Sequence, residues 1–582
     1  MRFSAVLNGG CDMRYKRLFG YMKKDMGTLA AVTVMALAGA FAGLLIPYET
    51  SLAIDCISIT GAVDWEQLRS RLLFIAALLI INALLEYGFT ALLGRMCARM
   101  ICDMRRDGFA HLSRMPVSYF DSVPFGDTMS RFVNDIETVS DGLRQLVTQL
   151  LPGVVTCIGS LIMIFVISWK AAIVVLAISP LYFVIASSIA KYSSKYFGKQ
   201  QNTLGDLTAH AEEYLGAGQV VRAYNLEDGA FERFSEINGE LNECGWRAQF
   251  CSALVNPTSR LVVNLTYALL GAAGCFMITG GTLTLGLVSG ILTYANHFSK
   301  PINELTGVMT QIQAALAASD RFFELLDAQP EKEDSDMPAL PECEESVAFE
   351  NVSFGYEGKR TLINGLSLDI PDNALVAIVG PTGAGKTTLV NLLMRFYEPK
   401  GGHIEIGGRN ISEYSRQSVR DKFSMVMQDT WLFEASVRDN IAFARPDATD
   451  EEIKQAAKRA SAHDFIKRLP DGYDTILTDG GERISQGQRQ LIAIARVMLT
   501  DAPMLILDEA TSSVDTMTEV RIQKAFRELM HGRTSFVIAH RLSTIRSADL
   551  ILVMDNGDVV ERGTHEQLVK KGGLYARLNA SL

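Results

Sequence analysis

Two kinds of hydrophobic pattern divide the chain. In the first half, long uncharged apolar runs recur, each close to the roughly 20 residues that a helix needs to cross a bilayer core about 30 Å thick. These runs predict six membrane-spanning helices, over residues 28–50, 71–96, 148–168, 171–190, 252–278 and 285–310. Beyond about residue 346 the pattern changes to short apolar strands and moderate helices. A helical membrane domain followed by a soluble α/β domain is therefore expected.

The charges around these spans predict the topology. Two long loops, after the second and fourth spans, carry many of the basic residues, which include Arg95, Arg99, Arg105, Arg106, Arg114, Lys191, Lys195 and Lys199. By the positive-inside rule these loops and both termini are cytoplasmic. Only Trp169 and Lys170 separate the third and fourth spans, which predicts an antiparallel hairpin.

The first span also has a different interpretation. AFA at residues 40–42 resembles a signal-peptide cleavage site, but the uncharged run over 28–46 exceeds the usual apolar region of about 7–15 residues. A membrane helix is therefore favoured, preceded by a basic amphipathic segment within a cytoplasmic tail, residues 1–27. The membrane domain is expected over 28–329, an acidic, proline-containing linker over 330–345, and the soluble domain over 346–582.

Composition excludes several other classes of protein. The formal net charge of −10 argues against nucleic acid as a partner. The nine cysteines show no CxxC pair and no regular spacing, so neither a disulfide framework nor a cysteine metal site is expected.

The strongest motif is VAIVGPTGAGKTTLV, residues 376–390. A β-branched strand leads into a glycine-rich loop and then a helix, which is the context that a GxxxxGK[ST] phosphate-binding loop requires. Backbone N–H groups and the helix dipole are expected to hold phosphate, with Lys386 on the β and γ oxygens and Thr387 on Mg²⁺. The expected nucleotide contacts of this loop are Gly380, Pro381, Thr382, Gly383, Ala384, Gly385, Lys386, Thr387 and Thr388.

Two further strands end in candidate catalytic groups. The buried run MLILDE, residues 504–509, ends in Asp508, expected to hold Mg²⁺, and Glu509, expected to polarise the attacking water. His540 follows the apolar strand at 535–539 and is expected near the γ-phosphate.

A polar junction, ISQGQRQ, precedes an apolar helix near residue 490. Ser485, Gly487 and the helix N-terminus form a second candidate anion site. Because one domain has no need of two γ-phosphate sites, the second site is expected to serve a nucleotide held by another copy of the domain. Two ATP molecules would then lie between two facing domains.

Together these motifs resemble a half-transporter of the ATP-binding cassette family, of the exporter type, over nearly the whole chain. The resemblance implies six long transmembrane helices in the type I exporter (type IV) fold, with an N-terminal elbow helix. It also implies a nucleotide-binding domain with a RecA-like core and a helical subdomain. It adds Tyr356 as the adenine-stacking aromatic, Gln428 as a Mg²⁺ sensor with a catalytic role, and Asp515 at a dimer seam.

Two features refine the resemblance. The family signature LSGGQ reads Ile484-Ser485-Gln486-Gly487-Gln488 here, so Gln486 replaces one glycine while the serine and the second glycine remain. The family also places short coupling helices near residues 115–122 and 216–224, docked on nucleotide domains.

The implied function is ATP-driven export of an amphipathic or hydrophobic drug-like or lipid-like molecule, with ATP and Mg²⁺ as cofactors. The chain is similar to the catalytically competent half of heterodimeric bacterial multidrug exporters, which favours a second, different subunit; a homodimer stays open. The implied location is the bacterial inner membrane. A lipid flippase, an exporter-fold importer of a siderophore-like compound, a soluble DNA-organising ATPase and a ligand-gated channel are the alternatives.

Polar residues within the spans are candidate substrate contacts. They are Asn82, Glu86, Asn264 and His297, with Tyr294 as a further candidate. Polar groups in hydrocarbon usually face a partner or a water-filled cavity. For Asn82 and Glu86, four residues apart on one helical face, an interhelical hydrogen bond is favoured over a cavity contact.

Overall fold

The chain forms two compact units. The computed structural model describes residues 11–57, 63–356, 361–428, 430–478, 484–508, 515–539 and 541–581. The first unit comprises Met1–Arg114 and Pro124–Gln329, and the second comprises Met115–Val123 and Pro330–Leu582. A short segment between two helices of the first unit therefore belongs to the second.

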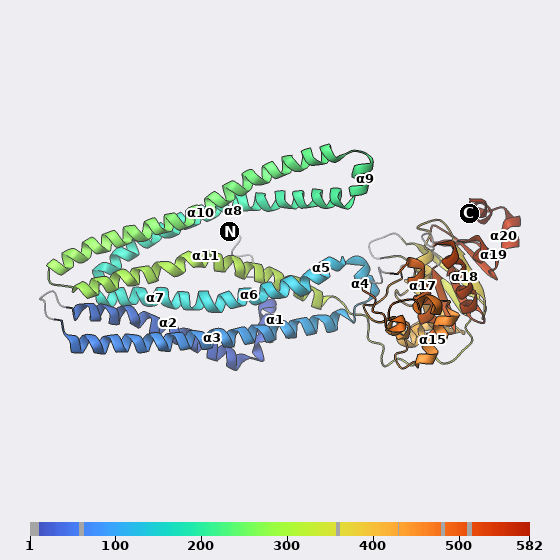
Figure 1. Cartoon of the computed structure of the whole chain (residues 1–582), viewed down its shortest axis with the longest axis horizontal. Coiled ribbons are helices and arrows are strands. Elements are labelled where there is room, and N and C mark those ends of the chain that lie inside the picture. The colour runs from blue at the N-terminus through green and yellow to red at the C-terminus, as the bar shows by residue number, and fades with distance from the viewer. Residues whose placement is uncertain are drawn as a thin grey trace. The chain divides into compact units, whose positions relative to one another are not determined.

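Helices make up the first unit, and its long helices are elongated in a common direction (Figure 1). Its α-helices are α1 Cys11–Lys23, α2 Met26–Asp55, α3 Trp65–Leu112, α5 Phe125–Ser130, α6 Ile136–Gln145, α7 Leu151–Ile167, α8 Trp169–Gly216, α9 Gly218–Ala223, α10 Glu227–Thr279 and α11 Leu285–Asp327. Helices α8 and α10 form a long pair joined at α9 (Figure 1). Two π-helical turns, Arg131–Asp135 and Leu146–Leu150, interrupt the run from α5 to α7. A helix lies at each of the six expected positions.

Several of these helices can cross a membrane. Within the described residues, four segments meet the length and hydropathy that spanning requires: Met26–Asp55, Trp65–Leu112, Phe125–Ile167 and Arg260–Thr279. Trp169–Leu181, at the start of α8, is a shorter apolar helix. The spanning of α8 and α11 stays a prediction.

The hairpin between α7 and α8 is tighter than expected. Trp169 and Lys170, which the sequence suggested as the connection, are the first residues of α8. Ser168 alone makes the turn, because its extended backbone ends α7 and its side chain accepts a hydrogen bond from the Ala171 N–H. Side-chain capping of this kind satisfies a backbone donor at the helix start.

Buried polar contacts fix how α11 packs. The Tyr294 side chain is fully buried, and its hydroxyl donates to the Leu44 carbonyl of α2 at 2.5 Å. Tyr294 is thus an interhelical contact. Nearer the other end of α11, Arg321 binds both carboxylate oxygens of the buried Asp135.

The second unit holds two sheets. An antiparallel sheet has the order β2-β1-β4-β5, and a larger, mainly parallel sheet has the order β10-β9-β3-β8-β7-β6. The strands are β1 Val347–Phe354, β2 Ile363–Ile370, β3 Leu375–Val379, β4 Gly401–Ile406, β5 Arg409–Asn410, β6 Phe423–Val426, β7 Met504–Asp508, β8 Thr534–Ile538, β9 Leu550–Asp555 and β10 Asp558–Gly563.

The larger sheet separates two hydrophobic cores. Successive side chains of a strand point to opposite faces. Ala377 and Val379 accordingly enter the core that holds α14 to α18, whereas Val376 and Ile378 enter the core shared with the antiparallel sheet. The helices of this unit are α4 Val117–Ser122, α12 Lys386–Leu393, α13 Arg416–Arg420, α14 Val437–Ala442, α15 Asp450–Arg459, α16 His463–Ile466, α17 Gln486–Thr500, α18 Thr516–Met530, α19 Leu542–Arg546, α20 His565–Lys571 and α21 Leu574–Ser581.

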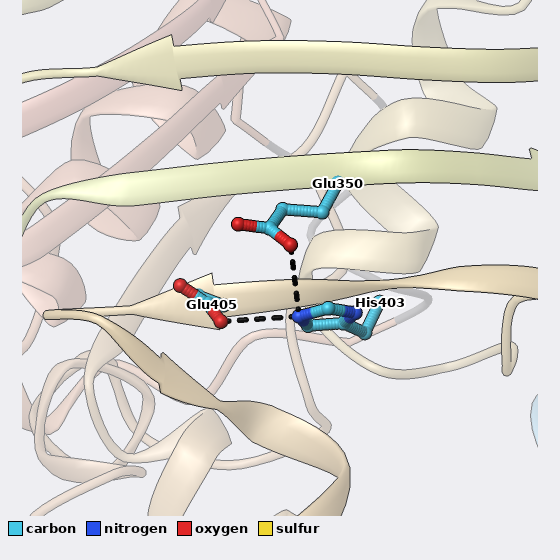
Figure 2. A group of neighbouring side chains, drawn as sticks. All are labelled: Glu350, His403 and Glu405. Atoms are coloured by element: carbon cyan, nitrogen blue, oxygen red, sulfur yellow. Dashed lines mark hydrogen bonds and ion pairs between the residues drawn. The ribbon is translucent and has the colours of Figure 1, made fainter.

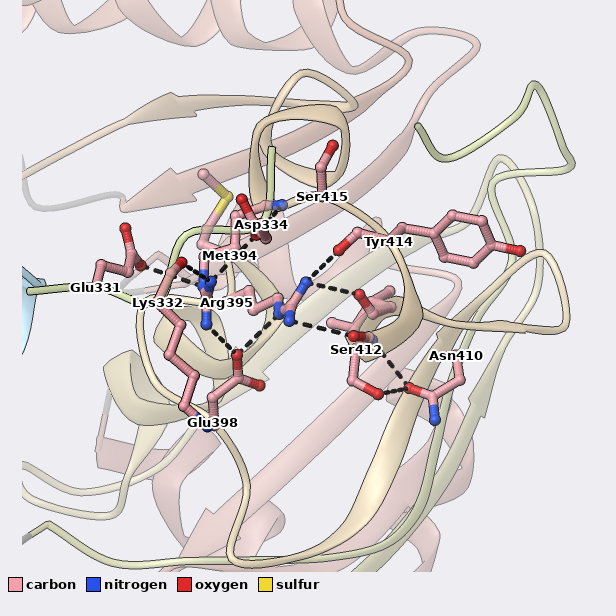
Figure 3. A network of polar contacts seen from close by, with 12 residues as sticks. Glu331, Lys332, Asp334, Met394, Arg395, Glu398, Asn410, Ser412, Tyr414 and Ser415 are labelled. Atoms are coloured by element: carbon pink, nitrogen blue, oxygen red, sulfur yellow. Dashed lines mark hydrogen bonds and ion pairs between the residues drawn. The ribbon is translucent and has the colours of Figure 1, made fainter. Parts of the chain in front are cut away.

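An arginine network holds the start of the expected linker segment, 330–345, against α13 and the loop after α12 (Figure 3). The Arg416 side chain is only 10% exposed, and its guanidinium contacts Glu331, Asp334 and Glu398. Arg395 also binds Glu398 and donates to the Ile411, Ser412 and Tyr414 carbonyls. The network also fixes the loop after α12, because Glu398 lies in that loop.

Substitution Arg416→Ala should release the linker segment. Removing Arg416 leaves the Asp334 carboxylate, only 18% exposed, without its ion-pair partner, whereas Glu331 and Glu398 keep Arg420 and Arg395. Loss of one partner of a largely buried ion pair costs about 3 kcal/mol. Hydrogen–deuterium exchange of the full-length protein should therefore show faster exchange at Met337 and Leu340, whose N–H groups donate to the Asp334 carbonyl and the Ser418 hydroxyl. Arg459→Ala, which removes the exposed pair with Glu528, is the matched control and should cost less than about 1 kcal/mol. Unchanged protection in Arg416→Ala would show that the network does not hold the segment.

Candidate functional site

The carboxyl ends of four parallel strands meet at one edge of the larger sheet. Ile378 of β3 pairs with Ile538 of β8, and Ile538 pairs with Asp508 of β7. On the far side of β7, Leu507 pairs with Val426 of β6. The phosphate loop follows β3 and Gln428 follows β6, so the register brings both to the edge that holds Asp508. Ligands of open α/β sheets bind outside this edge.

The phosphate loop needs glycine where it passes the neighbouring strand. A Cβ built on Gly380 would lie 2.2 Å from the Met554 carbonyl oxygen, which no side chain could tolerate. The loop then turns at Gly385, which has a φ of +97° and lies immediately before the first residue of α12. The N-terminus of α12 is thereby directed at the loop, where its unpaired N–H groups attract an anion.

Lys386 folds over this loop. Its ammonium donates to the Gly380 carbonyl at 2.8 Å and to the Pro381 carbonyl at 3.0 Å. Burial lowers the pKa of Lys386, while the Asp508 carboxylate acts in the opposite direction. An incoming phosphate would give the charged ammonium a stronger partner than these two neutral carbonyls.

The residues expected at Mg²⁺ are compatible with that ion. Thr387 supplies a hydroxyl on α12, Asp508 a carboxylate at the end of β7, and Gln428 an amide oxygen beyond β6. These are oxygen ligands, which Mg²⁺ prefers, and few enough to leave room for water and phosphate. All three belong to the same sheet edge.

Aromatic rings lie beside the phosphate loop. The Tyr356 ring makes edge-to-face contacts with Phe354 and Tyr397, with centroids 5.1 Å apart in each pair. The Tyr356 hydroxyl lies 3.1 Å from the Thr388 hydroxyl of α12. Tyr356 is therefore fixed next to the loop, as an adenine-stacking residue must be.

Tyr397 connects this aromatic group to α4. Its hydroxyl donates to an Asp121 carboxylate oxygen at 2.5 Å. Burial, and then the hydrogen bond to Asp121, raises the pKa of Tyr397, so the phenol stays a donor. Sequence reasoning missed Tyr397 and Asp121 as a pair. The two residues lie 276 positions apart, and no local pattern marks their contact.

The ISQGQRQ junction begins α17 as a capped helix. Ser485 Oγ accepts from the Gln488 N–H, and the Gln488 side chain accepts from the Ser485 N–H. The Ser485 hydroxyl proton is not used in this capping box and can be donated to a phosphate. Ser485 is exposed whereas Gly487 is buried, and Gln486 is the first residue of α17.

Asp515 is a further expected nucleotide contact, and it lies within the described residues. Asp515 caps α18 by accepting from the Thr518 N–H, and this hydrogen bond lowers the pKa of Asp515. Glu509 and His540 lie outside the described residues. Their roles remain predictions.

The four candidate substrate contacts are not joined. Within the described part of the chain, no hydrogen bond or ion pair links Asn82, Glu86, Asn264 and His297. Asn82 faces α2, since its Oδ1 lies 3.4 Å from the position of a Cβ on Gly39. Glu86 and Asn264 are exposed and His297 is half-buried.

Comparison with known proteins agrees with this geometry. The chain matches the family described as "ABC transporter transmembrane region" over residues 29–302 and that described as "ABC transporter" over 363–512. A fatty acid ABC transporter ATP-binding/permease protein of Mycobacterium bovis is 41% identical, covering 89% of this chain and 82% of that protein. An ATP-dependent lipid A-core flippase of Desulfotalea psychrophila is 36% identical, over 94% of this chain and 95% of the flippase.

A solved structure is similar over both units. The structure of a bacterial Atm1-family ABC exporter with ATP bound aligns with a TM-score of 0.76 at 29% identity. The alignment covers 96% of this chain and 98% of that one. The fold class expected from sequence, a helical transmembrane domain followed by an α/β nucleotide-binding domain, is confirmed.

Substitution Lys386→Ala should weaken nucleotide binding by the full-length protein at least about tenfold, because charge-assisted hydrogen bonds to phosphate are lost. Titration with a fluorescent ATP analogue measures the affinity. Lys458→Ala, on the exposed face of α15, is the control and should bind as the wild type does. Equal affinity of Lys386→Ala and wild type would contradict the phosphate-loop assignment.

Proposed function

The chain belongs to the ABC transporter family, and on this premise we propose that it is one half of a dimeric exporter of an amphipathic or hydrophobic small molecule. It is an integral membrane protein and an ATPase coupled to transmembrane transport. The proposal rests on the sheet edge where the phosphate loop, Asp508 and Gln428 meet. The same chain also has helices that are long and apolar enough to cross a membrane.

The sheet edge supports hydrolysis of the γ-phosphate bond. The phosphate loop and Lys386 hold the β and γ oxygens in place. Glu509, next to Asp508, takes a proton from a water molecule as the water oxygen bonds to the γ-phosphorus. The bond from that phosphorus to the bridging oxygen breaks, which leaves ADP and phosphate, and His540 orients the water or Glu509. Thr387, Asp508 and Gln428 would hold Mg²⁺, which would supply positive charge to neutralise the phosphates.

A second subunit completes each site. The Ser485 hydroxyl and the N-terminus of α17 form an anion site for which the same chain has no second phosphate. We place the γ-phosphate of the opposing subunit there, with Gln486, Gly487 and Gln488 around it and Asp515 at the seam. ATP then stabilises the closed pair to the extent that it binds that state more tightly.

The second subunit is either a different chain or a second copy of this one. The preference for a different subunit comes from the resemblance to heterodimeric exporters. Lys386, Asp508, Glu509 and His540 are all present in this sequence, so two copies of the chain would also make two complete sites. Mass spectrometry of the purified complex distinguishes a heterodimer from a homodimer.

Closure is coupled to the membrane helices through α4. This helix is joined in sequence to α3 and α5, and its Asp121 binds Tyr397, whose ring contacts Tyr356. A nucleotide base stacked on Tyr356 would therefore restrain Tyr397 and, through it, α4. In this scheme α9 plays the equivalent part on the opposing subunit.

The substrate is proposed by its chemistry. The similar proteins named above are a fatty acid transporter and a lipid A-core flippase, which favours a lipid-like molecule taken from the cytoplasm or the inner leaflet. Lipid flipping is compatible with the same architecture. Cytoplasmic termini, a bacterial inner-membrane location and contacts from Asn82, Glu86, Asn264 and His297 belong to this proposal.

Substitution Glu509→Gln should keep ATP affinity and lower the ATPase rate at least about 100-fold, as expected when a general base is removed. The measurements are nucleotide binding and phosphate release by the complex in lipid. Glu566→Gln, at an exposed residue on the first turn of α20, is the control and should hydrolyse ATP as the wild type does. A Glu509→Gln ATPase rate near that of wild type would remove Glu509 from its role.

Substitution Tyr397→Phe should uncouple ATP hydrolysis in the second unit from substrate binding by the membrane helices. The ring contacts remain, while the hydrogen bond to the Asp121 carboxylate, worth about 1.5 kcal/mol, is lost. Basal ATPase activity and ATP affinity should stay within about twofold of wild type, because the nucleotide contacts are unchanged. Stimulation of ATPase activity by lipid or drug should fall several-fold. Tyr414→Phe removes a hydroxyl elsewhere in the unit and serves as the control; equal stimulation in both variants would exclude this route.

A further inference from the structure

Three side chains with metal-binding atoms converge on the outer face of the antiparallel sheet (Figure 2). Glu350 of β1 lies directly opposite His403 of β4, and Glu405 lies two residues further along β4. Directly opposed residues, and residues two apart on one strand, share a face of a sheet. We call Glu350, His403 and Glu405 the His403 cluster.

We propose that the His403 cluster binds a divalent transition-metal ion of the Zn²⁺ class. His403 Nε2 lies 3.4 Å from a Glu350 oxygen and 3.0 Å from a Glu405 oxygen, and all three ligand atoms lie within 4.8 Å of one another. Ligands about 2.1 Å from a tetrahedral Zn²⁺ are separated by about 3.4 Å, so small side-chain rotations suffice. One imidazole and two carboxylates fill three positions and leave one for water.

The charges of the cluster favour a cation. Two carboxylates point at the same imidazole nitrogen, and a neutral imidazole can donate from that nitrogen to only one of them. Among the residues that the structure describes, neither glutamate pairs with lysine or arginine, and each forms an ion pair with His403 alone. A divalent cation would neutralise both carboxylates. The imidazole selects a transition metal over Mg²⁺ or Ca²⁺, which prefer oxygen ligands.

The backbone holds the three ligands in place before metal arrives. β1 carries a bulge between Glu350 and Ser353, and bulges change the direction of nearby side chains. β4 approaches β1 closely at Gly402, where a Cβ would lie 2.2 Å from the Glu350 carbonyl oxygen. Gly402 also has a φ of +71°, so glycine is required next to His403. A rigid sheet reduces the ordering that metal binding costs.

Metal at this cluster would join β1 to β4. β1 ends at Phe354, and Tyr356 follows two residues later beside the phosphate loop. The ion would therefore restrain the strand that leads to the aromatic group. Binding itself does not depend on the proposed transport function, since the cluster lies outside the nucleotide site.

Equilibrium dialysis of the nucleotide-free, full-length protein in lipid nanodiscs against Zn²⁺, with excess Mg²⁺ present, tests the proposal. Elemental analysis gives the Zn²⁺ bound per chain. Wild type and the control His531→Gln, at an exposed histidine, should bind one more Zn²⁺ per chain than His403→Gln. Glu350→Gln should bind that ion at least about tenfold more weakly. ATPase activity without Zn²⁺ should be the same in all variants, which shows that each is folded.

Co²⁺ substitution distinguishes this cluster from the cysteines. Co²⁺ bound to nitrogen and oxygen gives no thiolate charge-transfer band, and its visible absorption should disappear in His403→Gln. Equal Zn²⁺ uptake by wild type and His403→Gln would overturn the proposal. A thiolate charge-transfer band from the bound Co²⁺ would also overturn it. Complete displacement of Zn²⁺ by Mg²⁺ would do the same. Absence of Zn²⁺ uptake would leave His403 as a hydrogen-bonding bridge between two glutamates and would also overturn it.

Discussion

The register of the parallel sheet places the groups that handle phosphate. Pairing of β3, β8 and β7 sets the phosphate loop and Asp508 at one edge, and β6 adds Gln428. A shift of one residue in any of these pairings would turn each side chain to the opposite face and move the strand end away from the edge. The two hydrophobic cores on either face of the sheet oppose such a shift. The apolar interior of the unit thus determines the geometry of the polar site.

Contacts away from the sheet edge connect the nucleotide site to other parts of the second unit. The Arg395 and Arg416 network holds the loop after α12, and Tyr397 in that loop contacts both Tyr356 and Asp121. One short loop therefore joins the arginine network, the aromatic group and α4. α4 lies in sequence between α3 and α5 of the first unit but belongs to the second unit. This arrangement is the physical basis of the coupling proposed above.

The sequence allowed prediction where chemistry is local and failed where it is not. The phosphate loop, the Asp508 carboxylate at the end of β7 and the apolar spans each depend on contiguous residues, and strand ends predict one sheet edge. The Tyr397–Asp121 bond, the Arg416 contacts with the linker segment and the His403 cluster join residues far apart in sequence. Only cross-strand register and tertiary packing bring them together. The turn at Ser168 was missed because a capping side chain, not hydropathy, decides where α8 begins.

The most direct test of the account is a cryo-electron microscopy map of the Glu509→Gln complex, purified with its natural second subunit, in ATP and Mg²⁺. The account predicts ATP between the phosphate loop of this chain, Gly380–Thr388, and the signature helix of the opposing subunit. It likewise predicts that Ser485 and Gly487 of this chain cover the opposing nucleotide. ATP bound to well-separated domains, or phosphate density away from the carboxyl edge of the sheet, would contradict it.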